Sequence, residues 1–174
     1  MKTIIIYTSQ TGFTKNYAEL IGREISCECV DVKKAGKINL SEYDAVVFGG
    51  WFMADTIAKL SWFKKKIPAL AAAGKKIIVY VTGATPAESP ALPLAIRKNF
   101  SAEEWSAIKT FYCPGGLNYD KMNWLSRTVM KMLAKALCSK KDATEDDRKK
   151  AEMISSSYSL FDKKYIDPIL AELK

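Results

Sequence analysis

The chain has 174 residues, 48% of them hydrophobic, which fits one globular domain and excludes an intrinsically disordered protein. It contains no histidine, which excludes Ser-His and Cys-His catalysis and the usual histidine-containing zinc sites. The formal net charge of +8 indicates a basic surface that suits an anionic membrane, nucleic acid or an acidic partner, without choosing among them.

The cysteines and the first residues predict a cytoplasmic protein. Cys27 and Cys29 stand too close together for a zinc ribbon or a C-x-x-C redox pair, so we interpret them as reduced, packed side chains. Residues 1–8 carry only a short apolar run, and no small-residue cleavage site follows. No uninterrupted apolar stretch approaches the roughly 20 residues that span a bilayer.

Strand and helix patterns alternate along the chain. Strands are expected at 2–8, 27–32, 45–49, 76–82 and 107–113, and helices at 14–25, 57–73 and 145–172. Thr14 is the expected N-cap of the first helix, and Pro168 is expected to break the last one. Strands separated by helices and joined by short connections predict a parallel sheet covered on both faces.

The loop between the first strand and the first helix has the composition of a phosphate site. A phosphate placed there would meet free backbone N–H groups and the positive end of the helix dipole. The loop lacks both G-K-[ST] and G-x-G-x-x-G, which disfavours a triphosphate and a dinucleotide. We interpret it as a site for a terminal monophosphate, the alternative being a plain polar turn. The candidate residues are Thr8, Ser9, Gln10, Thr11, Gly12, Phe13 and Thr14.

The segment T-S-Q-T-G-F-T resembles the T-x-T-G-x-T phosphate loop of flavodoxins. The segments Y-D-A-V-V-F-G-G and G-K-K-I-I-V-Y-V-T-G extend the likeness over the chain, residues 1–174, as one domain. With F-Y-C-P-G-G-L-N-Y and the insert after it, the sequence resembles the flavodoxin-domain subfamily that includes bacterial menaquinone-dependent protoporphyrinogen dehydrogenases. The resemblance implies a flavodoxin-like three-layer α/β/α sandwich, a five-stranded parallel sheet of order 2-1-3-4-5, and one bound FMN.

The same resemblance implies that the ends of the third and fourth strands contact the flavin ring. Aromatic and thioether side chains suit a flat ring, although Trp51 and Phe52 could equally be core or partner-facing aromatics. No catalytic acid or base is predicted, because FMN itself would carry the redox chemistry. The candidate ring contacts are Gly50, Trp51, Phe52, Met53, Thr82, Gly83, Ala84 and Thr85.

Residues 117–142 form an insert after the fifth strand, and a helix is expected at 119–141. Basic residues accompany its apolar stripe, which suits a helix lying on an anionic membrane. Packing of the stripe on the domain or on a partner is the other interpretation, and both stay open here. The stripe comprises Met122, Leu125, Val129, Met132 or Leu133, and Ala136 or Leu137.

Together these features predict an FMN-dependent oxidoreductase that passes electrons between a reduced substrate and a quinone or a partner protein. The resemblance adds protoporphyrinogen oxidation as a candidate reaction. A non-enzymatic electron carrier and a flavin-free membrane-surface module are the alternatives. The basic charge departs from the usual acidic flavodoxins and would repel the basic partners on which those carriers dock. No nucleic-acid partner is expected, and the sequence leaves the oligomeric state open.

Overall fold

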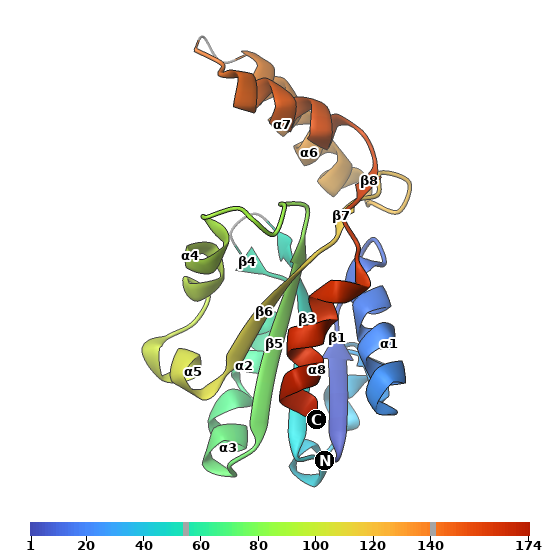
Figure 1. Ribbon diagram of the computed structural model, residues 1–174, viewed down its shortest axis with the longest axis vertical. Coiled ribbons are helices and arrows are strands. Elements are labelled where there is room, and N and C mark those ends of the chain that lie inside the picture. Colours follow the sequence, from blue (N-terminus) through green and yellow to red (C-terminus); the bar gives the residue numbers. More distant parts are fainter. Residues whose placement is uncertain (54–55, 140–141) are drawn as a thin grey trace.

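A central parallel sheet organises the protein, seen in a computed structural model that describes residues 1–53, 56–139 and 142–174 (Figure 1). The strand order is β2-β1-β3-β5-β6, which confirms the predicted order 2-1-3-4-5. A short β4 (Thr56–Ile57) pairs antiparallel with the end of β3, a strand that the prediction lacked. The main strands are β1 (Thr3–Tyr7), β2 (Glu28–Asp31), β3 (Ala45–Met53), β5 (Lys76–Gly83) and β6 (Lys109–Pro114).

Helices cover both faces of the sheet, as Figure 1 shows. One face carries α1 (Phe13–Ile25) and α8 (Asp167–Leu173), and their apolar side chains share a buried cluster with those of β1 and β5. Every residue of β1 is buried, as expected for a parallel strand with two covered faces. The other face carries α2 (Leu60–Lys64), α3 (Ile67–Ala72), α4 (Leu92–Arg97) and α5 (Ala102–Ala107).

The predicted helix at 57–73 is wrong as a single element, because β4, α2 and α3 occupy its place. Pro68 gives the physical reason: it lacks an N–H group, and its ring would clash with the carbonyl of Lys64, where α2 ends.

The first helix also begins differently from the prediction. Gly12, with φ of 102°, occupies the N-cap position, and no side chain caps α1. Thr14 therefore lies inside the helix and is not its cap; it is buried and bonded to another part of the chain.

The insert and the segment after it form a projecting helical hairpin. Figure 1 shows α6 (Trp124–Ser139) and α7 (Glu145–Ser155) side by side, beyond the end of the sheet. A two-stranded arm, β7 (Gly116–Leu117) with β8 (Tyr158–Ser159), carries this α6–α7 hairpin. The expected helix at 119–141 begins only at Trp124, because the side chain of Asn123 accepts a hydrogen bond from the amide of Ser126, at 2.8 Å.

The predicted closing helix at 145–172 is likewise wrong as one helix. It divides into α7, strand β8, a 3-10 turn at Lys163–Ile166, and α8. The break precedes Pro168 because Tyr158 leaves the helix to pair with Leu117 of β7. Within the described part of the chain, no helix has the length and apolar character needed to cross a bilayer.

Candidate functional site

The phosphate loop (residues 8–14) is shaped by backbone hydrogen bonds at both of its ends. The amide of Thr8 donates to the carbonyl of Gly49 at 2.9 Å, which keeps the loop beside β3. The hydroxyl of Ser9 accepts from the amide of Gly12 at 3.1 Å. The first hydrogen bond of α1 joins Asn16 N to Gly12 O, so the amides just before Asn16 lack partners inside the helix. The N-terminus of α1 with the phosphate loop before it, here called the mouth of α1, therefore has the free N–H donors and the positive dipole end that favour binding of an anion.

A buried pair of hydroxyls ties the phosphate loop to the end of β5. Thr14 and Thr82 are each 2% exposed, and their Oγ1 atoms lie 2.7 Å apart. Beneath them, the hydroxyl of the fully buried Tyr80 donates to the carbonyl of Thr14 at 2.9 Å. Burial raises the pKa of Tyr80 well above its ordinary value, so the hydroxyl keeps its proton. The hydrogen bonds with Tyr80 and Thr82 thus hold the first turn of α1 against the end of β5.

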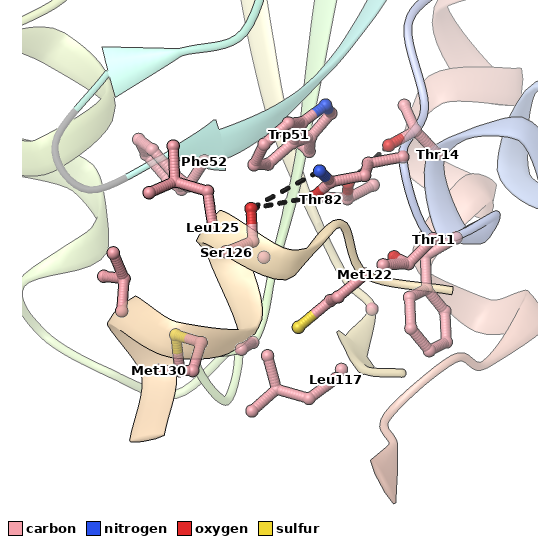
Figure 2. A pocket seen from close by; sticks show the side chains of 17 residues that line it. Thr11, Thr14, Trp51, Phe52, Thr82, Leu117, Met122, Leu125, Ser126 and Met130 are labelled. Carbon is pink, nitrogen blue, oxygen red and sulfur yellow. Dashed lines mark hydrogen bonds between the residues drawn. The ribbon is translucent and has the colours of Figure 1, made fainter. Parts of the chain in front are cut away.

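A cavity of about 280 Å³, here called the ring cavity, opens beside this mouth. Figure 2 shows Trp51 and Phe52 on one side of it and Leu125 at the start of α6 facing them. A mainly apolar wall with a few polar groups is typical of cofactor and small-molecule sites. The predicted residues that line it are Gln10, Thr11, Phe13, Thr14, Trp51, Phe52, Thr82, Gly83 and Ala84.

A second, more open cavity of about 490 Å³, here called the loop cavity, lies on the other side of the phosphate loop. It includes the predicted residues Ser9 and Gly12, and it shares Gln10 and Thr11 with the ring cavity. Its charged lining residues are Lys15, Asp31 and Lys121.

Three predicted residues lie outside the lining of both cavities, and the side chain of a fourth is not described. Thr8, Gly50 and Thr85 are not among the residues that line either cavity. Thr85 contributes its carbonyl, which accepts a hydrogen bond from the hydroxyl of Tyr112 at 2.7 Å. The side chain of Met53 lies outside the part of the structure described.

Sequence reasoning missed that the insert forms one wall of the ring cavity. The side chains of Gln10 and Ser126 lie 3.4 Å apart and hydrogen-bond, as the dashed lines of Figure 2 mark. The apolar stripe was visible in the sequence, but the direction in which it would face was not. The wall is made by Leu117, Met122, Leu125, Ser126, Val129 and Met130.

Tyrosines hold the loop after β5 in place. The hydroxyl of Tyr158, on β8, donates to the carbonyl of Ala84 at 2.6 Å, and burial raises its pKa to about 12. Burial likewise raises the pKa of Tyr112 above its ordinary value. Both phenols stay neutral at physiological pH and act as hydrogen-bond donors. Across residues 1–53, 56–139 and 142–174, no group of acidic or cysteine side chains is arranged to hold a metal ion.

The chain is similar to several solved structures. Flavodoxin 2 from Bacillus cereus is 16% identical, with 89% of this chain and 98% of that chain covered and a TM-score of 0.49. A flavoprotein from Lactobacillus acidophilus, solved in complex with FMN, is 17% identical, with 65% and 91% covered and a TM-score of 0.44. A flavodoxin from the domain Archaea is 19% identical, with 70% and 88% covered and a TM-score of 0.45.

No curated protein matches the chain. The sequence profile of the flavodoxin domain, in contrast, matches residues 4–145, which is more than half of the chain. The protein therefore belongs to the flavodoxin domain family.

Proposed function

We propose that the chain binds FMN, with the monophosphate at the mouth of α1 and the isoalloxazine ring in the ring cavity. The observation that carries the proposal is that Thr11 lies between the ring cavity and the loop cavity. This residue lines both the apolar ring cavity and the polar loop cavity, so one ligand with a flat ring and a phosphate could occupy both.

The residues present fit such a ligand. Gly12 has φ of 102°, and a Cβ built there has Lys121 Nζ within 4 Å as its one close neighbour among the described residues beyond the adjoining chain, so the backbone is open to a phosphate. Trp51 and Phe52 offer aromatic surface for the ring, and Gly83 and Ala84 line the opposite loop.

When bound, FMN supplies the electron-transfer chemistry. The chain supplies binding, orientation and protection from water. Trp51, Phe52 and Leu125 surround the ring cavity with apolar surface, while the buried Thr14–Thr82 pair keeps the two loops at a fixed spacing. Such fixed surroundings set the position of the ring against an incoming substrate.

Beyond FMN binding, we propose that the protein is an oxidoreductase that passes electrons to a quinone or a partner protein. The apolar wall contributed by α6 supports it, because a largely apolar substrate could enter beside that wall. Protoporphyrinogen is a candidate reduced substrate only because the sequence resembles the subfamily that includes protoporphyrinogen dehydrogenases. Turnover of protoporphyrinogen or of a menaquinone analogue by the FMN-loaded protein tests this; electron exchange with partner proteins alone would favour a carrier.

Flavin titration tests the binding proposal. We expect the wild-type protein to bind FMN, and Thr11→Val to weaken that binding by about tenfold, because a hydrogen bond to a charged phosphate is lost. Riboflavin, which lacks the phosphate, should bind both proteins equally. Thr110→Val, on β6 away from both cavities, is the matched control. Unchanged FMN affinity in Thr11→Val would contradict the phosphate assignment.

The exposed face of α6 supports a second proposal, a peripheral contact with anionic membrane. Trp124 is 77% exposed and Met132 is 66% exposed, and Leu133 is exposed as well. The residues Trp124–Ser139 include three basic side chains and no acidic one. Exposed apolar groups with a basic surround complement a bilayer that contains anionic lipid.

Vesicle sedimentation tests this contact. The double variant Trp124→Ser/Met132→Ser should bind anionic vesicles at least about tenfold more weakly, because two apolar side chains no longer enter the interface. Leu94→Ser is the control, since Leu94 on α4 is 61% exposed but lies outside the hairpin. Equal binding to zwitterionic vesicles, or an equal loss in Leu94→Ser, would refute the proposal.

A further inference from the structure

The segment between β7 and α6 returns to the phosphate loop. A Cβ atom built on Gly12 would lie 3.9 Å from the Nζ atom of Lys121, so this ammonium group stands at the mouth of α1. Met122 lines the ring cavity together with Thr11, and Ser126 hydrogen-bonds to Gln10. The start of the insert therefore rests on the loop at several points.

The position of Lys121 is held by its own turn. Its amide donates to the side-chain oxygen of Asn118 at 3.2 Å and also lies 3.2 Å from the carbonyl of Asn118. This turn orients the backbone of residue 121 before α6 begins, while the lysine side chain remains exposed.

Two lysines, Lys15 and Lys121, line the loop cavity, and they differ in their surroundings. The phosphate loop itself contains no charged side chain. Lys15 lies 3.5 Å from Glu19 in an ion pair, and the carboxylate of Asp31 accepts a hydrogen bond from the amide of Lys33. Among the residues that the structure describes, Lys121 has no carboxylate within ion-pair distance.

We propose that Lys121 is a phosphate-binding residue that joins the phosphate of FMN to the start of the α6–α7 hairpin. This inference rests on the proposed binding of FMN. An ammonium group close to the loop amides provides a charge-assisted contact to a dianion, which the uncharged loop cannot supply. Phosphate at the loop then holds both Gly12 and Lys121, so occupancy of the site and the position of the hairpin are coupled. Because such coupling is reciprocal, a partner that holds the hairpin in this position raises the affinity for FMN.

Flavin titrations of Lys121→Gln test the contact. We expect about tenfold weaker binding of FMN, unchanged binding of riboflavin, and a smaller loss of FMN affinity on raising the salt concentration. Lys121→Arg, which keeps the charge, should restore most of the affinity. Lys131→Gln removes the same charge from an exposed position further along α6 and should leave FMN binding unchanged.

Hydrogen exchange provides a readout that does not depend on activity. FMN should slow amide exchange at residues 119–126 in the wild type more than riboflavin does, because both ligands carry the ring but only FMN carries the phosphate, and Lys121→Gln should abolish that difference. Equal FMN affinity in the wild type and Lys121→Gln would overturn the role of Lys121 and leave the proposed function intact. Absence of FMN binding by the wild type would overturn both.

Discussion

Gly49→Ala should lower the free energy of unfolding by about 3 kcal/mol, since overpacking a filled core forces side chains off their positions. A Cβ atom at Gly49 would lie 2.2 Å from both Cζ and the hydroxyl oxygen of Tyr80. The tyrosine is fully buried, so its ring cannot swing into solvent. Urea unfolding followed by tryptophan fluorescence measures the loss.

The same substitution should also weaken FMN binding, because the displaced ring is the one that supports the phosphate loop. The Tyr80 hydroxyl donates to the Thr14 carbonyl, and Thr14 in turn contacts Thr82. Gly36→Ala is the control, since a Cβ built at Gly36 meets nothing within 4 Å in the described parts of the chain apart from the adjoining residues. A stability loss no larger than in Gly36→Ala would show that the packing of Gly49 against Tyr80 is not rigid.

Gly116→Ala should release the α6–α7 hairpin from the domain. Gly116 has φ of +132°, and a Cβ there would lie 2.2 Å from the carbonyl oxygen of Tyr158. Because Gly116 pairs with Ser159 in the arm, relief of this contact requires β7 and β8 to separate. We expect a local cost of about 3 kcal/mol from the backbone strain and the overlap together.

Limited proteolysis and hydrogen exchange measure that release. Residues 116–117 and 158–159 should lose protection and the hairpin should be cut sooner, while the sheet keeps its protection. Gly74→Ala is the matched control, because Gly74 also has a positive φ, 64°, but a Cβ built there would meet no described residue within 4 Å other than the adjoining ones. Equal effects in the two variants would show that the overlap with Tyr158 costs nothing.

The hairpin matters for the proposed function because it meets the cavities that FMN would occupy. Its first turns line the ring cavity, Lys121 stands at the phosphate loop, and Tyr158 of the arm holds the carbonyl of Ala84. Release of the arm should therefore weaken FMN binding. Because Gly116 also lines the ring cavity, the loss of affinity is read together with the loss of protection at residues 116–117 and 158–159. Unchanged FMN affinity in Gly116→Ala would show that the β7–β8 arm only connects the hairpin to the domain and does not support the FMN site.

Local patterns were enough to predict the main strands and the polar loop between the first strand and the first helix. The apolar run at 3–7, the loop after it and the helix that follows are contiguous, so short-range rules apply to them. Two details of the helices were predicted wrongly, and both have local causes. Pro68 divides the helix predicted at 57–73, and Gly12, not Thr14, is the N-cap of α1. Proline and glycine act through backbone geometry that an apolar periodicity does not contain.

The amino-acid sequence by itself determined where the parallel strands lie along the chain and placed the polar loop before the first helix, because buried runs and turn residues are read from neighbouring positions. The order of the strands in the sheet was implied by the resemblance to flavodoxins. Only the tertiary structure decided where the insert lies, because the pairing of Leu117 with Tyr158 joins distant segments. The placement of Lys121 beside Gly12 likewise brings together positions that are far apart in the sequence. An amphipathic stripe marks one face of a helix as apolar, but whether and by what that face is covered depends on how the whole chain packs.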